Sequence, residues 1–172
     1  IIIFSLAWKF VFVPYQKARI INFIHPLQDI RGTGYNAYQS MIAVGSGGLF
    51  GKGVGYGTQS RLNFLPEYKT DFIFAAYAEE WGFVGAIILL LFYFIILYKL
   101  AKYALLADST FETLFTYGVF IWFLTHITIN IGMNIGIMPV TGIPLPFMSY
   151  GGSHLLAEGI ALGMCVGMYR YA

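Results

Sequence analysis

A long stretch without charge is the feature that most constrains the fold. Between Thr113 and Met138 no Asp, Glu, Lys or Arg interrupts the sequence. A helix needs roughly 20 apolar residues to cross the hydrocarbon core of a bilayer. Inside that core the backbone must satisfy its own hydrogen bonds, which a helix does. The stretch therefore predicts a transmembrane helix over residues 113–138.

Two further runs have the same character. Residues 72–98 carry only Glu79 and Glu80 as charges, and residues 147–169 carry only Glu158. In the whole chain 58% of residues are hydrophobic and 10% are charged, against about 25% charged in soluble domains. The sequence therefore predicts an all-α, multi-span transmembrane helix bundle.

The remaining segments fit around these three helices. Residues 1–13 are apolar but too short to span, and we expect them to end a further transmembrane helix. Residues 14–71 mix Pro, Gly and charge, which predicts a large loop with short amphipathic helices. Residues 139–146 contain three prolines and form a short link. We expect residues 1–172 to form part of one integral-membrane domain.

The basic residues predict the orientation of the helices. Lys99 and Lys102 follow one span and Arg170 ends another, and an even number of spans separates the two places. Short loops rich in Lys and Arg face the cytoplasm. Residues 14–71 and 139–146 are then extracytoplasmic. The net charge of only +2 argues against a nucleic-acid partner, and the single Cys165 excludes an intramolecular disulfide.

Asp71 stands where the polar loop meets an apolar helix. A carboxylate there can simply favour the helix N-terminus. Partial desolvation at this boundary can also tune it as a general base. Both interpretations are open from spacing alone. Small residues follow at helical spacing and would let another helix approach closely: Ala75, Ala78, Gly82 and Gly85.

Three carboxylates lie deeper in the predicted spans, namely Glu79, Glu80 and Glu158. Intramembrane carboxylates are costly and usually face a cavity or a partner. They can line a polar cavity, or form buried pairs that hold the bundle together. Since the three spans contain no Lys or Arg, basic partners must come from the loop or from other helices.

A glycine-rich run over residues 45–57 has seven glycines in thirteen positions. Lys52 and Arg61 flank its backbone amides, and such a loop can hold a phosphate or pyrophosphate. The run lacks the spacing of a Walker loop. A flexible hairpin or a re-entrant turn is the alternative.

Polar and small residues recur on the later helices. His126, Asn130 and Asn134 are four apart and share one face, which favours interhelical hydrogen bonding over a metal site. Small residues at spacings of four predict packing faces: Gly132, Gly136, Gly159, Gly163 and Gly167.

Several ordered motifs resemble those of one protein family. The motifs GTGY at residues 32–35, QSMIAVGSGG at 39–48 and LPEYKTDFIF at 65–74 are similar to the large extracellular loop of the RodA/FtsW/SpoVE (SEDS) family. Residues 139–153, PVTGIPLPFMSYGGS, resemble the signature before its last helix. Thr141 stands where FtsW proteins tend to carry Lys, so the chain is most like RodA.

The resemblance implies a reaction. Members polymerise lipid II into glycan strands on the outer membrane face. Asp71 matches the essential aspartate and would be the general base for the acceptor's sugar 4-hydroxyl. Asn63 and Lys69 stand where many members carry Glu and His. A divalent cation could help neutralise the pyrophosphate, although no metal ligands are recognisable. The resemblance and the local charges together predict these substrate-binding residues: Lys52, Arg61, Lys69, Glu79, Glu80, Ser149, Tyr150, Gly151 and Gly152.

The resemblance also implies a setting and partners. We expect a multi-pass protein of the bacterial inner membrane that serves cell elongation and rod shape. Its partners would be lipid II, a class B penicillin-binding transpeptidase and other membrane proteins of the elongation complex. Two rival functions use the same features: a lipid II flippase, which would depend on the intrahelical carboxylates, and a non-catalytic scaffold, which would tolerate changes at Asp71.

Overall fold

The computed structural model describes residues 13, 16–17, 19, 23, 34–62, 64–65 and 67–171, without the side chains of residues 60, 61 and 171. Within this part the regular structure is helical and contains no strand. The predicted first helix end, residues 1–13, lies outside it apart from Val13. The helices are α3 (Tyr35–Ser46), α4 (Thr58–Arg61), α5 (Ile73–Leu106), α6 (Thr110–Asn134) and α7 (Gly152–Tyr171).

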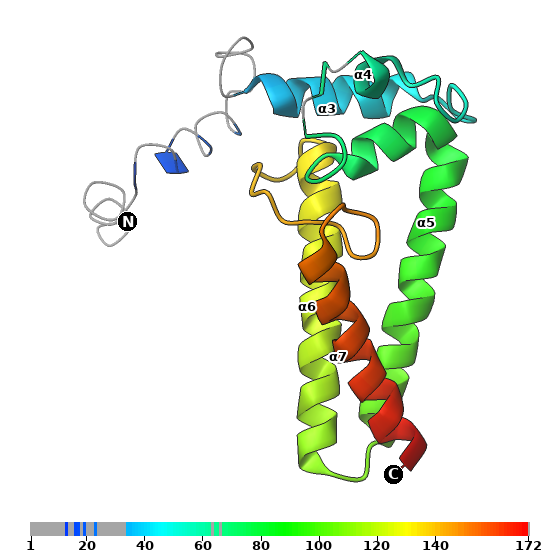
Figure 1. Cartoon of the computed structure of the whole chain (residues 1–172), viewed down its shortest axis with the longest axis vertical. Coiled ribbons are helices and arrows are strands. Elements are labelled where there is room, and N and C mark those ends of the chain that lie inside the picture. The colour runs from blue at the N-terminus through cyan, green and yellow to red at the C-terminus, as the bar shows by residue number, and fades with distance from the viewer. Residues whose placement is uncertain are drawn as a thin grey trace.

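Three long helices form the body of the molecule (Figure 1). Helices α5, α6 and α7 run along its long axis, and α3 lies across one end. The link between α6 and α7 folds back at that same end, next to the start of α5. Of the described helices, α5 and α6 are long and apolar enough to cross a membrane. For α7, the span remains a prediction.

The helix boundaries differ from the predicted ones for local reasons. Helix α5 continues beyond residue 98 to Leu106. Helix α6 ends at Asn134, four residues early, because Gly136 adopts a left-handed φ of 79°. Helix α7 starts at Gly152 rather than at residue 147. Apolar character continues through residues 135–138 and 147–148, so composition alone does not locate these ends.

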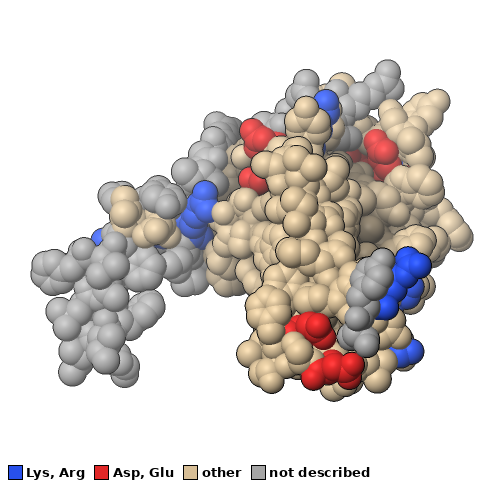
Figure 2. Space-filling model, turned by 60° about the horizontal axis from the view of Figure 1, so that its bottom comes forward, with Lys and Arg blue, Asp and Glu red and all other residues tan. Residues whose placement is uncertain are grey.

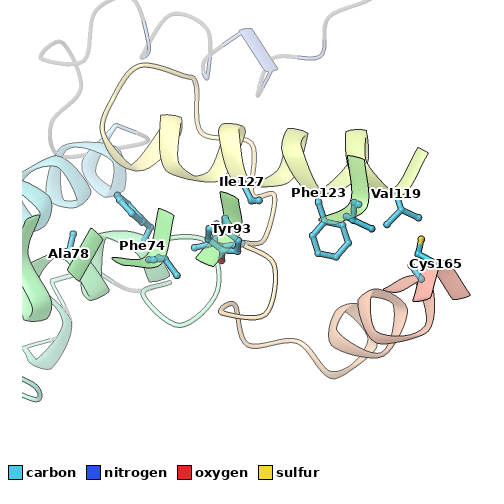
Figure 3. Packing of buried hydrophobic residues seen from close by; sticks show 11 residues of the cluster. Phe74, Ala78, Tyr93, Val119, Phe123, Ile127 and Cys165 are labelled. Atoms are coloured by element: carbon cyan, nitrogen blue, oxygen red, sulfur yellow. The ribbon is translucent and has the colours of Figure 1, made fainter. Parts of the chain in front are cut away.

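The buried core lies where the three long helices meet. Tyr93, Phe123 and Cys165 come from α5, α6 and α7 and belong to one cluster of buried side chains (Figure 3). The outward faces are also apolar: Phe92 and Phe94 of α5 are 61% and 65% exposed. Apolar surface of this extent indicates contact with lipid. In Figure 2 the visible Asp and Glu side chains lie toward the top and bottom of the helical body, with mostly uncharged surface between them, and some Lys and Arg atoms lie on its left side.

Helix α5 is broken near its start. Gly82 has φ 67° and ψ −166°, which interrupts the helical backbone. The glycine-rich loop supplies the hydrogen bonds that the break removes. The amides of Lys52 and Gly53 donate to the carbonyls of Glu79 and Glu80 at 3.0 Å. Beyond the break, the amides of residues 83 and 84 donate to the carbonyls of residues 48 and 49, at 2.9 and 3.1 Å. We call residues 47–53 the splint.

The glycines of the splint are needed for close backbone contact. A Cβ at Gly51 would overlap the carbonyl of Glu80, and a Cβ at Gly82 would overlap the amide of Gly51. The loop is therefore a fixed turn docked on α5, not a flexible hairpin. Because two of its amides are bonded to α5, they are not available to a phosphate.

Candidate functional site

Asp71 lies in the turn immediately before α5, at the end of the molecule where α3 crosses. Its backbone carbonyl accepts hydrogen bonds from Asn130 Nδ2 at 3.0 Å and Asn134 Nδ2 at 3.2 Å. Both amides project from the last turns of α6. The predicted polar face of α6 therefore holds the turn before α5 through its two asparagines, whereas His126 contacts Trp122 of its own helix and the carbonyl of Pro144.

The two residues before Asp71 are held in the same way. Ser149 Oγ donates to the carbonyl of Thr70 at 2.7 Å, and the amide of Tyr150 donates to the carbonyl of Lys69 at 2.8 Å. Three consecutive carbonyls thus have donors from α6 and from the link before α7. We call this arrangement the carbonyl clamp. It fixes the backbone of Asp71 and uses neither oxygen of its carboxylate.

The Asp71 carboxylate is half-buried, and no described residue donates a hydrogen bond to it. Its Oδ2 lies 3.3 Å from the position that a Cβ on Gly142 would occupy. Burial, and to a smaller extent the charge of Glu67, raises the pKa of Asp71 above its ordinary value, and the charge of Arg19 opposes this. A carboxyl group of this kind can accept a proton more readily than an exposed one.

Asn134 also connects the site to the rest of the fold. Its Oδ1 accepts from the amide of Ala75 at 3.2 Å and from Ser40 Oγ of α3 at 3.1 Å. All three residues are buried. Of the predicted stripe of small residues, Ala75 is buried in one cluster with Ala43 of α3. Gly82 instead contacts the splint, and Gly85 is crowded by Trp81 and Tyr77 of α5 itself.

Five of the predicted substrate-binding residues line one groove of about 410 Å³ beside Asp71. Apolar side chains form much of the remaining wall, and Tyr150 is 82% exposed at the rim. Asp71 does not line this groove itself, although its neighbours two residues away on either side do. The lining residues are Lys69, Ile73, Phe147, Met148, Ser149, Tyr150, Gly151, Gly152 and Leu155.

The other predicted binding residues lie elsewhere. Glu79 is fully buried, and its Oε1 lies 2.7 Å from Lys52 Nζ. It also accepts hydrogen bonds from the backbone amides of Thr58 and Gln59. The sequence predicted that a basic partner of Glu79 would come from the loop or from other helices, and the structure identifies it as Lys52 of the loop. Glu80 is half-buried, and the side chain of Arg61 is outside the described part of the chain.

A metal site is not evident among the described residues, where no three His, Cys, Asp or Glu side chains come together. The predicted role of a divalent cation thus stays a prediction.

One residue near the site was not predicted from the sequence. Arg19 donates to the carbonyl of Thr141 at 3.1 Å and is close enough to affect Asp71. It lies about fifty positions before Asp71, so no local pattern connects the two.

The glycines of the two predicted packing faces differ in how closely other atoms approach them. Gly132 and Gly136 are crowded by methionine side chains, Met138 and Met41 respectively. Around Gly159, Gly163 and Gly167 of α7, by contrast, no described atom lies within 4 Å of where a Cβ would stand. Within the described chain, the α7 glycines are not a packing face.

Fold and site together define a helical membrane protein that presents a carboxylate beside a groove at one end of its bundle. The family model of FtsW, RodA and SpoVE, described as cell cycle proteins, matches residues 1–172. The chain belongs to this family, as its motifs predicted.

Curated relatives carry related names. The chain is 43% identical over 166 residues to the peptidoglycan glycosyltransferase MrdB of Escherichia coli (strain K12), covering 96% of the chain and 45% of the relative. It is 45% identical over 160 residues to the peptidoglycan glycosyltransferase RodA of Treponema pallidum (strain Nichols), covering 93% and 37%. The chain thus spans less than half the length of these relatives.

Two solved structures are similar. One is a chain from a study of how a peptidoglycan synthase complex coordinates polymerization and crosslinking; its TM-score is 0.75 at 31% identity, covering 96% of this chain and 44% of that one. The other is a variant of the rod shape determining protein RodA of Thermus thermophilus. Its TM-score is 0.57 at 30% identity, covering 80% and 49%.

Proposed function

We propose that the protein polymerises lipid II into glycan strands for cell elongation, with Asp71 as the general base. The observation that carries the proposal is the contrast at Asp71 between a clamped backbone and a carboxylate without a described donor. A purely structural carboxylate at a helix start would be expected to bond nearby amides. Asp71 is instead held by its carbonyl, and its side chain is left for another molecule.

The proposed reaction requires a base near a sugar hydroxyl. The acceptor's 4-hydroxyl attacks the anomeric carbon of the growing strand, the new glycosidic bond forms, and undecaprenyl pyrophosphate leaves. Proton removal by a positioned side chain contributes roughly 10²–10⁴-fold in rate. A raised carboxyl pKa makes the ionised Asp71 carboxylate a better proton acceptor than an exposed one.

The groove beside Asp71 suits a lipid-linked pyrophosphate. Lys69 supplies a positive charge, and Ile73, Phe147 and Leu155 supply apolar walls. A cation favours the leaving pyrophosphate, and the apolar walls can contact an isoprenoid chain. By contrast, Lys52 is occupied by Glu79. We therefore assign the pyrophosphate contact to Lys69 rather than to Lys52.

The state of the intrahelical carboxylates disfavours the flippase alternative. Glu79 and Glu158 are 0% and 1% exposed, and both are engaged with neighbouring groups of the chain. A carboxylate that lines a transport path needs access to the cargo. The buried-pair interpretation of these two residues is the better supported one.

The setting is proposed on the same basis. The end with Asp71 and the groove would face the outside of the bacterial inner membrane, in a multi-pass arrangement. Because one similar chain comes from a peptidoglycan synthase complex, we propose a class B penicillin-binding transpeptidase as partner. The crosslinking enzyme would act on the strand as it is made.

The function is tested with the protein at its natural length, purified with its cognate transpeptidase and supplied with lipid II. We expect glycan strands that resolve as a ladder on a gel. A parallel sample in lipid vesicles reports on transfer of lipid II between leaflets. If no strand forms although the partner is bound, and lipid II crosses the vesicle membrane, the protein is a transporter.

A further inference from the structure

The link before α7 is held by every long helix. Backbone groups of the segment Ile143 to Phe147 form hydrogen bonds with side chains of α6, α5 and α7, in that order along the segment. Asn130 of α6 donates to the Ile143 carbonyl at 2.8 Å, and Tyr93 of α5 donates to the Pro146 carbonyl at 2.7 Å. From α7, Glu158 Oε2 accepts from the amide of Phe147 at 3.0 Å.

Phe147 has an uncommon backbone conformation. Its φ is 58°, and among the described residues no other non-glycine has a positive φ. L residues avoid this region because the Cβ meets the backbone, so the surroundings must impose it. The Phe147 ring packs against that of Phe123 on α6 at a centroid distance of 5.6 Å, and it lines the groove.

The second carboxylate oxygen of Glu158 also has a close polar neighbour. Its Oε1 lies 2.9 Å from His154 Nε2, one turn earlier on α7. The two atoms do not meet in good hydrogen-bond geometry, and neither has another described partner. The contact is a close polar approach that restricts where the carboxylate can lie. The nearby ring of His126 stacks on that of His154 at 5.4 Å.

We propose that Glu158 is a positioning residue for the groove. It holds the amide of Phe147 so that the strained turn persists and the Phe147 ring stays in the groove wall, which sets the affinity for the lipid-linked substrate. The inference rests on the proposed function, since it assigns the groove to lipid II. The same turn leads within two residues to Ser149, which holds the carbonyl of Thr70.

The test compares Glu158→Leu with Glu158→Gln in the natural-length protein bound to its transpeptidase. The Leu side chain removes the acceptor of the Phe147 amide, whereas the Gln side chain keeps one. We expect Glu158→Leu to raise KM for lipid II by roughly tenfold and to leave kcat within about twofold, while Glu158→Gln stays near wild type. Glu112→Leu, a carboxylate change at the far end of α6, should leave KM unchanged.

Hydrogen exchange gives a second, independent readout. The amide of Phe147 should exchange slowly in wild type and in Glu158→Gln, and fast in Glu158→Leu. If its exchange is the same in all three, or if KM stays constant when exchange rises, the proposal is overturned. A fall in kcat with constant KM would also contradict it.

Phe147→Ala covers the case in which Glu158→Leu does not fold. This variant keeps Glu158 and its hydrogen bond but removes the ring from the groove, and it should raise KM by a similar factor. An unchanged KM would overturn the proposal. Binding of lipid II without turnover, measured in an Asp71→Asn background, separates the two proposals. If wild type makes no strands, the function fails, yet binding and exchange still test Glu158.

Discussion

Asp71 combines a fixed backbone with a carboxylate that has no described donor. The backbone carbonyls of residues 69, 70 and 71 all accept hydrogen bonds. Their donors are the amide of Tyr150, the hydroxyl of Ser149, and the side-chain amides of Asn130 and Asn134, in that order. Each such bond contributes only about 1 kcal/mol to stability. Their importance lies in position, because a base acts well only when its distance to the proton is constant.

The pH dependence of polymerisation should show the raised pKa of Asp71. A general base works when ionised, so kcat should fall as the pH drops through the pKa of Asp71. Burial raises that pKa from an ordinary value of 3.8, so the fall should begin at a higher pH than for an exposed carboxyl. Initial rates at saturating lipid II measure this. An acid limb that persists unchanged in the residual activity of Asp71→Asn would assign it to another group.

Helix α5 shows why a glycine-rich run need not be a ligand loop. The break at Gly82 leaves carbonyls on one side and amides on the other without helical partners. The splint bonds to both sets. The short segment over residues 73–81 and the long segment over residues 83–106 can therefore act as one element, and the turn with Asp71 is attached to the short one.

Two glycines of this loop give a matched comparison. Gly51 and Gly55 have φ values of 77° and 78°, but only Gly51 would place a Cβ against backbone. Gly55→Ala should cost about 1–2 kcal/mol for the left-handed conformation. Gly51→Ala should cost roughly a further 1–3 kcal/mol from steric overlap. Thermal unfolding in detergent checks both, and equal losses would show that the splint can move away.

The Lys52–Glu79 pair belongs to the same element. Lys52→Met would leave the fully buried Glu79 carboxylate without its cation, at a cost of roughly 3 kcal/mol. Replacing Glu79 by Gln in the same protein should recover part of that loss, because the charge that lacked a partner is gone. A double-mutant cycle of unfolding measures the coupling. If Lys52→Met is stable and instead raises KM for lipid II, Lys52 contacts substrate.

Sequence patterns located most elements but not their ends or their long-range contacts. The helices over 72–98 and 113–138 and the polar face of α6 followed from charge and spacing. The break at Gly82 and the turn at Phe147 did not, because apolar residues continue across both. They depend on partners distant in sequence: the splint for Gly82, and Glu158 with Phe123 for Phe147. Asp71 was recognised from its motif, while the clamp around it required the fold.

At the scale of the whole molecule, the candidate site and the basic residues that predict the orientation lie at opposite ends. The start of α5, next to Asp71 and the splint, is at the end crossed by α3 (Figure 1). The last turns of α5 and α7 are at the opposite end, and they belong to the segments that carry Lys99, Lys102 and Arg170. The uncharged surface between the ends is the part that a bilayer would cover (Figure 2). A substrate with a lipid tail and a polar head would meet the protein at the boundary.

Membrane orientation can be measured with a thiol reagent that does not cross membranes. Cys165, the chain's one cysteine, is buried and can be replaced by Ala. In that background, Tyr150→Cys should react in intact cells, whereas Asp108→Cys should react only after permeabilisation. Both side chains are exposed. The reverse pattern would place Asp71 and the groove on the cytoplasmic side, where finished glycan strands are not assembled.

We propose that Asp71 is the base of a glycan polymerase. The most direct measurement is the rate of strand formation at saturating lipid II by wild type and Asp71→Asn, at natural length and bound to the transpeptidase. The Asn side chain keeps the size and removes the base, and the buried charge is lost, so the variant should fold at least as well. We expect a rate at least about 100-fold lower, with Glu112→Gln, at the far end of α6, near wild type as control. A folded, partner-bound Asp71→Asn protein that polymerises at the wild-type rate would show that Asp71 is not the base.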